Sequence, residues 1–313
     1  MANIYETDLP QNPANYEALS PLSYLKRSAT LYPEYPAIVH GDLVQNWGET
    51  YQRCIKFASA LSKAGIGKGD TVAVMLPNIP EMFELHFSVA MTGAVLNAIN
   101  TRLDDKTVAF ILDHGEAKVF ITDAEFSSVT ASALDIANST PLVLDVEDPL
   151  FTEGELVGSM TFNEMLATGD EIFDWSLPDD EWDAISLNYT SGTTGNPKGV
   201  VYHHRGAYLN AANNALTWDM GLHPRYLWTL PMFHCNGWCF PWTLAALGGT
   251  SICLRNVSAG AIFSAIAEKQ VSHFCGAPII LNLLVNAKDS ERKSFSHPVN
   301  VMTAAAPPPP SVL

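Results

Sequence analysis

The sequence predicts an α/β protein with mainly parallel strands. Short apolar runs alternate along the chain with longer segments of helical periodicity. These runs lack the polar alternation of strands that have one face in water, so they suit parallel strands covered on both faces by helices. The strand candidates are the runs at 71–76, 118–123, 141–146, 184–190 and 250–255.

The first elements are predicted to be a hairpin followed by a helix. The stretch AIVHGDLVQNW, residues 37–47, indicates two short strands joined by a turn at Gly41 and Asp42. The next helix carries Cys54, Ala58 and Leu61 at helical spacing, and a glycine at position 65 can end it.

Three further helix starts have local signals. Pro80 suits the first turn of the helix in IPEMFELHFSVAMTG. Thr161 and Glu164 have the spacing of a capping box. The residues Tyr202, His203 and His204 are predicted to begin a helix over HRGAYLNAANNALTWDM, with one imidazole solvated and the other packed, which favours a structural interpretation over a metal-binding pair.

A polar, acidic passage at residues 144–183 interrupts this rhythm. It is interpreted as a surface connection between two sheets. The chain is therefore divided, as an approximation, into subdomains 1–182 and 183–313.

Composition excludes several classes of function. With 33 acidic and 17 basic residues the formal charge is −16, which repels nucleic acid and anionic membrane surfaces. We find no secretory signal, and the apolar stretches are interrupted before the roughly 18 residues that a spanning helix needs. Five scattered cysteines indicate reduced core thiols and a cytoplasmic location. His234, Cys235 and Cys239 lack a fourth zinc ligand, so no metal site is predicted.

The stretch YTSGTTGNPKGVVYHH, residues 189–204, predicts an anion-binding loop. Its glycines let the backbone N–H groups approach a ligand, its hydroxyl side chains add donors, and Lys198 adds one positive charge. A Walker loop is excluded because Lys198 lies between Pro197 and Gly199. The Rossmann fingerprint also fails, since GIGKGD at 65–70 precedes a strand and has Asp70 at the third glycine position.

This loop resembles the signature phosphate loop of the adenylate-forming superfamily, which includes acyl-CoA synthetases, luciferases and peptide-synthetase adenylation domains. The segments around NWGETYQRCIKF, VAMTGAVLNAINTRL and LPMFHCNGW resemble other parts of the acyl-CoA synthetases, so the resemblance covers nearly all of the chain. It implies an incomplete N-terminal AMP-binding domain with two mainly parallel sheets flanked by helices, and no C-terminal mobile domain. The isolated polypeptide is then expected to be catalytically poor.

The resemblance also implies an acid–thiol ligase that forms an acyl-adenylate from ATP and then a thioester with coenzyme A. Lys198 and His234 would be catalytic, with His234 near the acyl carboxylate. The acid pocket would be lined by His234, Trp238, Gly276, Ala277 and Pro278. The nucleotide would be bound by Thr190, Ser191, Gly192, Thr193, Thr194, Gly195 and Lys198 at its phosphates, and by Ala305, Ala306 and Pro307 at its adenine.

Magnesium is an expected companion of the nucleotide. Between Lys118 and Lys198 there is no lysine or arginine, so no basic patch in this tract can neutralise a triphosphate. ATP is therefore expected to arrive as its magnesium complex.

Several alternatives stay open at this point. The variants FHCNGW and LNAINTRLD resemble the methylmercaptopropionate-CoA ligase group, with medium-chain fatty-acid ligases next, and a hydrophobic pocket separates such similar acids weakly. A non-catalytic nucleotide-binding module and a luciferase-like monooxygenase are the competing functions. The expected partners are small molecules, a carboxylic acid, ATP and coenzyme A. The oligomeric state is open, a homodimer included.

Overall fold

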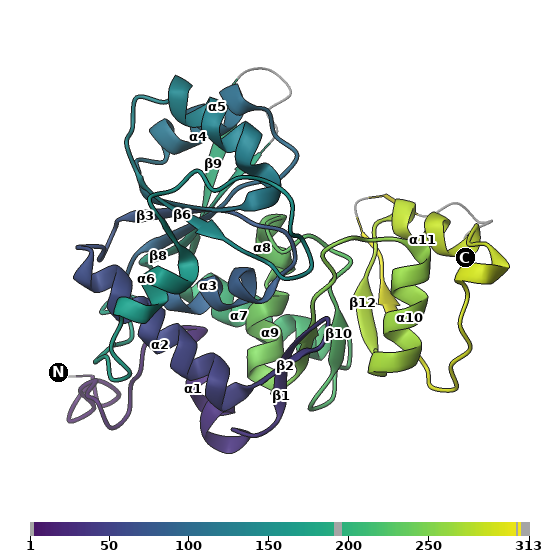
Figure 1. Ribbon diagram of the computed structural model, residues 1–313. Helices are drawn as coiled ribbons and strands as arrows, with labels where there is room; N and C mark the ends of the chain where they lie inside the picture. The colour runs from purple at the N-terminus through teal and green to yellow at the C-terminus, as the bar shows by residue number, and fades with distance from the viewer. Residues whose placement is uncertain (1–2, 191–195, 305, 308–313) are drawn as a thin grey trace.

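The computed structural model describes residues 3–190, 196–304, 306 and 307, and its core is two twisted sheets separated by helices (Figure 1). The first sheet has the order β13-β12-β10-β11-β1-β2. All of its neighbouring strands are parallel except the β1–β2 hairpin. Its strands are β1 (Pro36–His40), β2 (Leu43–Asn46), β10 (Arg225–Leu227), β11 (Thr250–Ile252), β12 (His273–Cys275) and β13 (Asn300–Met302).

The second sheet has the order β7-β6-β5-β3-β4-β8-β9. It is parallel except for the β8–β9 hairpin at one edge. Its strands are β3 (Thr71–Met75), β4 (Val95–Ala98), β5 (Ala117–Asp123), β6 (Leu142–Val146), β7 (Met160–Thr161), β8 (Ala184–Thr190) and β9 (Lys198–His203). The predicted fold class, α/β with two mainly parallel sheets, is confirmed.

Helices form three layers, one between the two sheets and one on the outer face of each sheet. The largest apolar core lies between the sheets, where α1 (Leu22–Leu31), α2 (Trp47–Lys63), α3 (Pro80–Met91), α6 (Phe162–Thr168), α7 (His204–Thr217) and α9 (Phe240–Leu247) pack. A second core lies under α4 (Asp105–His114) and α5 (Ser127–Ile136) on the outer face of the β3–β5 sheet. A third lies under α10 (Ala259–Lys269) and α11 (Pro278–Val285) on the outer face of the other sheet. The remaining short segments are η1 (Ala124–Phe126), α8 (Cys235–Trp238) and η2 (Asp289–Glu291).

The local sequence signals are confirmed. The first hairpin turns at Gly41 with φ +58°, and α3 begins at Pro80. Thr161 and Glu164 form the reciprocal capping box at the start of α6. Helix α2 ends two residues before Gly65, whose φ of +84° lies in the left-handed region.

The two sheets interleave along the chain. Strands β8 and β9 follow residue 183 yet complete the sheet of β3–β7, whereas β1 and β2 from the start of the chain join β10–β13. A division at residue 182 therefore does not separate the sheets. The prediction that residues 144–183 connect two sheets is wrong, because the strands on either side of that passage belong to one sheet.

A buried ion-pair network joins the two sheets. The guanidinium of Arg255, which follows β11, donates to Asp123 at 2.6 Å and to Asp148 at 2.8 Å. Asp123 ends β5 and Asp148 follows β6, and all three side chains are at most 2% exposed. Asp148 also binds the imidazole of His40, the last residue of β1, at 2.9 Å. The carboxyl ends of strands from both sheets therefore meet at this network.

Removal of this guanidinium is expected to destabilise the protein strongly. Arg255→Met should lower the free energy of unfolding by about 3–5 kcal/mol, because it leaves two buried carboxylates without their cation. Urea unfolding measures the loss. The matched control is Lys293→Met, which breaks an exposed pair with Glu268 and should change the free energy by about 0.5 kcal/mol or less. Equal small effects for both variants would contradict the role assigned to Arg255.

Candidate functional site

The predicted phosphate loop is the connection of the β8–β9 hairpin. Thr190 ends β8, Lys198 begins β9, and the two residues are paired across the hairpin. Both side chains are exposed, and Lys198 has no ion-pair partner among the described residues. A cation that makes no ion pair with the described residues, next to a hydroxyl donor, can bind an anion. The predicted phosphate ligands Ser191, Gly192, Thr193, Thr194 and Gly195 lie outside the described residues.

The hairpin register places Lys198 on the same face as a cavity wall. Directly paired antiparallel residues share a face, and successive pairs alternate. Thr190 with Lys198, Asn188 with Val200, and Ser186 with Tyr202 therefore all face one side. Lys198 and Tyr202 are four residues apart on one strand, so their Cα atoms are about 13 Å apart.

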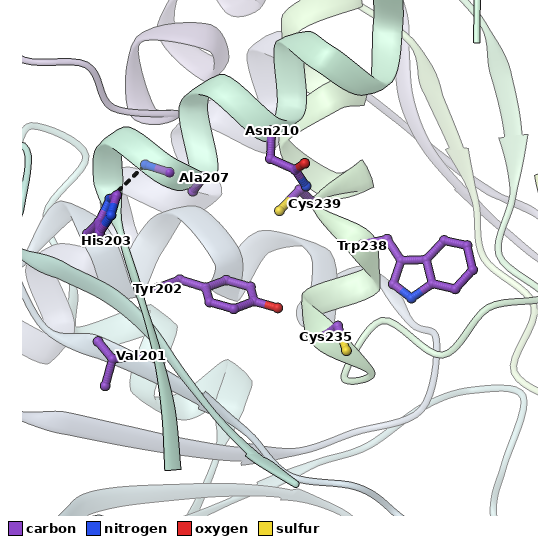
Figure 2. A pocket seen from close by; sticks show the side chains of 9 residues that line it. Val201, Tyr202, His203, Ala207, Asn210, Cys235, Trp238 and Cys239 are labelled. Atoms are coloured by element: carbon purple, nitrogen blue, oxygen red, sulfur yellow. Dashed lines mark hydrogen bonds between the residues drawn. The ribbon is translucent and has the colours of Figure 1, made fainter. Parts of the chain in front are cut away.

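Tyr202 lines a cavity of about 390 Å³ between β9, α7 and α8 (Figure 2). Figure 2 shows the Tyr202 ring pointing toward α8, with Asn210 of α7 beside Cys239. Burial, with the neighbouring Cys235 thiol, raises the pKa of Tyr202 to about 12. The wall is largely apolar, so the cavity suits a small organic group. It is lined by Val201, Tyr202, His203, Gly206, Ala207, Asn210, Cys235, Trp238 and Cys239.

Only one of the predicted acid-pocket residues, Trp238, lies in this wall. His234 is exposed and immediately precedes the wall residue Cys235. Gly276 is buried and donates its N–H to the carbonyl of Met302 at 2.9 Å. Ala277 and Pro278 follow it at the start of α11.

The remaining predicted residues follow the ends of neighbouring parallel strands. Strands β10, β12 and β13 are adjacent. Trp238 lies in the segment after β10, Gly276 in the segment after β12, and Ala306 and Pro307 in the segment after β13. Carboxyl ends of parallel strands share one edge of a sheet, where open α/β sheets bind their ligands. Ala306 and Pro307 are exposed there, and Ala305 lies outside the described residues.

A buried amide, which the sequence analysis missed, links this edge to the other sheet. Asn78 follows β3 and donates its Nδ2 to the carbonyls of Trp228 at 2.9 Å and Leu230 at 3.2 Å. Its Oδ1 accepts the N–H of Met232 at 2.8 Å. Three hydrogen bonds from one side chain thus fix the segment that leads from β10 to the cavity wall.

The wall segment itself has an unusual backbone. Residues 235–239 all have positive φ, between +44° and +65°. This left-handed region costs a non-glycine residue about 1–2 kcal/mol, so the segment needs support from its surroundings. No local sequence signal predicts it, since only Gly237 of the five is a glycine.

The paired histidines differ from their prediction in one respect. Tyr202 and His203 end β9, and the helix begins at His204. The backbone turns at His203 because its Nδ1 accepts the N–H of Gly206 at 2.8 Å and caps α7. His204 is buried and binds the hydroxyl of Ser20 at 2.9 Å, whereas His203 is half-buried and stacks on Trp182. One ring is therefore packed, as predicted, and the other is partly covered.

Two periodicities could have revealed some of the other wall residues. Along a strand, alternate residues share a face, so Tyr202 follows from Lys198 once the hairpin is known. Along a helix, residues three and four apart share a face, which relates His203, Ala207 and Asn210.

Two kinds of site receive no support from the described part of the chain. It holds no cluster of three or more His, Cys, Asp or Glu side chains with the arrangement of a metal site. Among its helices, none combines the length and the apolar character needed to cross a bilayer.

Comparison with known proteins identifies the family. The family described as AMP-binding enzyme matches residues 25–313. The chain belongs to the AMP-binding enzyme family. It is 50% identical to acetate/butyrate–CoA ligase AAE7, peroxisomal, of Arabidopsis thaliana and 49% identical to acetate–CoA ligase CCL3 of Humulus lupulus, each over 98% of this chain.

A solved structure agrees with the fold. The inhibitor-bound N-terminal domain of FACL13 from Mycobacterium tuberculosis is 29% identical and superposes with a TM-score of 0.81, over 94% of this chain and 71% of that one. The chain spans 56% of the length of each of the two plant relatives. One of these relatives is named as peroxisomal, and a cytoplasmic location for this chain stays a prediction.

Stability of this AMP-binding family member is expected to fall as the pH is lowered from about 6.5 to 4. Burial lowers the pKa of His204 to about 4, whereas an unfolded histidine titrates near 6.5. Between these values the unfolded chain binds a proton that the folded chain does not, so the group costs about 1.4 kcal/mol of stability for each pH unit lost. Urea unfolding should show that the free energy of unfolding falls less between pH 7 and pH 5 in His204→Asn than in the wild type. The same fall in both proteins would contradict the lowered pKa of His204.

Proposed function

We propose that the chain provides the nucleotide-binding and acid-binding parts of an AMP-forming acyl-CoA synthetase. The observation that carries the proposal is the hairpin register, by which Thr190 and Lys198, which has no ion-pair partner in the described part of the chain, share a face with the cavity residue Tyr202. An acyl-adenylate has its anionic part and its acyl part covalently joined, so it needs a cation and a cavity on one surface. The names of the plant relatives, acetate/butyrate–CoA ligase and acetate–CoA ligase, support this reaction class.

In this proposal the hairpin binds the phosphates of ATP. Lys198 supplies positive charge where negative charge develops on the leaving pyrophosphate, and Thr190 supplies a hydroxyl donor. Lys198 makes no ion pair with a described residue, so ligand binding breaks none of the ion pairs in that part of the chain. The adenine is assigned to the segment of Ala306 and Pro307 after β13, where small side chains leave space for a base.

The acid is assigned to the cavity beside Trp238. A volume of about 390 Å³ lies in the range of small-ligand pockets and suits an acid of short or medium chain length. A straight-chain fatty acid and 3-methylmercaptopropionate are both candidates, since they differ by little more than a sulfur atom in place of a methylene group. His234 lies beside the wall, where its exposed imidazole can contact the carboxylate of the acid.

Magnesium and coenzyme A complete the proposed reaction. The described residues provide no cage of carboxylates for a metal, which fits an ion that arrives bound to the nucleotide phosphates and keeps most of its waters. Bound in that way, the ion would neutralise part of the phosphate charge while Thr190 and Lys198 hold the phosphates. Coenzyme A would accept the acyl group as a thioester.

In the full-length enzyme, Lys198→Ala is expected to lower ATP–pyrophosphate exchange by about 100- to 1000-fold, the typical cost of one transition-state donor. Its free energy of unfolding should change by about 0.5 kcal/mol or less, because the side chain is exposed. Lys106→Ala removes another exposed lysine, on α4, and is the matched control.

Two outcomes of this experiment would weigh against the proposal. Exchange at the wild-type rate in Lys198→Ala would exclude the role of the lysine. ATP binding without any pyrophosphate exchange in a longer gene product that contains this chain would instead favour a non-catalytic nucleotide-binding module.

Chelation of magnesium is expected to abolish nucleotide binding. The chain is acidic overall, with a formal charge of −16, and free ATP adds several further negative charges to the hairpin face. Isothermal titration with ATP in magnesium and in excess chelator measures the difference. Equal affinity in both buffers would show that the hairpin binds the nucleotide without the ion.

A further inference from the structure

The left-handed turn at residues 235–239 requires contacts from outside itself. Because four of its five residues carry a Cβ atom, its positive φ values are unfavourable for the isolated segment. Within the turn, the N–H of Cys239 donates to the carbonyl of Asn236 at 2.9 Å. Local bonds of this kind do not remove the steric cost of the left-handed region, so contacts from the surrounding elements stabilise the conformation.

Three side chains from other elements bind the turn, and one of them, Thr243 on α9, contacts the carbonyl oxygen of Cys239 at 3.1 Å through its hydroxyl. The hydroxyl of Ser186, on β8, donates to Oδ1 of the fully buried Asn236 at 2.7 Å. At the far end, Nδ2 of Asn214, on α7, donates to the carbonyl of Trp238 at 2.8 Å. Between them, Gly237 packs so tightly on the indole of Trp228 that an added Cβ atom would lie 2.7 Å from the ring.

The contact from β8 has a particular consequence. Ser186 is four residues before Thr190 on the same strand and on the same face of the hairpin. The strand that carries the proposed phosphate-binding residues therefore also fixes the wall of the proposed acid cavity. A shift of the strand would be transmitted to the cavity wall through the hydrogen bond between Ser186 and Asn236.

We propose that Ser186 is a positioning residue for acid binding. Through Asn236 it holds the left-handed turn, and the turn places Trp238 and Cys239 in the cavity wall at a set distance from the phosphate hairpin. This assignment rests on the proposed function, but the conformation of the turn can be tested without any ligand.

Thiol labelling tests the turn directly. Of the five cysteines only Cys235 is exposed, and burial raises the pKa of the Cys239 thiol to about 11. Maleimide labelling with mass-spectrometric localisation should therefore modify Cys235 rapidly and Cys239 slowly in the wild-type protein. In Ser186→Ala the turn loses its support on one side, and labelling of Cys239 should become at least about tenfold faster.

The chain offers a matched control and a second variant. Ser88 is also fully buried, but its hydroxyl has no partner among the described residues, so Ser88→Ala should label like the wild type. Asn236→Gly removes the same contact while tolerating a φ of +44°, and Ser186 keeps the carbonyl of Leu96, at 3.1 Å, as a partner. It should also expose Cys239. Wild-type labelling of Cys239 in either folded variant would overturn the proposal.

Acid selectivity provides the second measurement. The wild type and Ser186→Ala are each titrated with butanoate, hexanoate and octanoate in the presence of magnesium ATP. The ratios between the affinities for the three acids should differ by about fivefold or more between the two proteins, whereas the affinity for ATP should be the same. A uniform change for all three acids would overturn the positioning role. Wild-type protein that binds neither ATP nor any acid would overturn the proposed function itself, and the labelling result would still report on the turn.

Discussion

The buried guanidinium of Arg255 is the contact on which the relative placement of the two sheets depends. It follows a strand of one sheet and binds two carboxylates of the other sheet, one at the end of β5 and one after β6. A buried cation is stable only when its partners are held in place, so the network fixes Asp123 and Asp148 as much as they fix it. All of these residues lie at or just after the carboxyl ends of their strands, so the network holds the carboxyl edges of the two sheets against one another.

The neutral side chain of Asn78 also links the two sheets. Its amide donates to the carbonyls of Trp228 and Leu230 and accepts the N–H of Met232. The loop after β3 and the segment after β10 therefore cannot move independently. A loop is normally the most variable part of an α/β unit. Here the segment that leads to the cavity wall is anchored in both sheets, which gives a binding surface the rigidity that a packed core would have.

The sequence predicts what local chemistry determines. Thr161 with Glu164, and the turn at Gly41, are recognised because each signal lies within four residues. Sheet membership is different, since β1 pairs with β11 more than 200 positions later and no local pattern shows it. The predicted phosphate loop resembles the two local signals, because its motif is contiguous in the sequence. Asn78, Ser186 and Asn236 could not be identified in this way, because their partners are distant in sequence and a lone polar residue does not reveal its partner.

The electrostatics of the proposed nucleotide site follow from this geometry. A chain with a formal charge of −16 cannot attract a polyphosphate over long distances, and salt screens such attraction beyond about 8–10 Å. Affinity must then come from contacts at hydrogen-bond range, which fall off steeply when a donor is displaced. Such contacts are useful only on a rigid support. The pairing of Thr190 with Lys198, and the attachment of the same strand to the cavity wall through Ser186, provide that support where the net charge cannot.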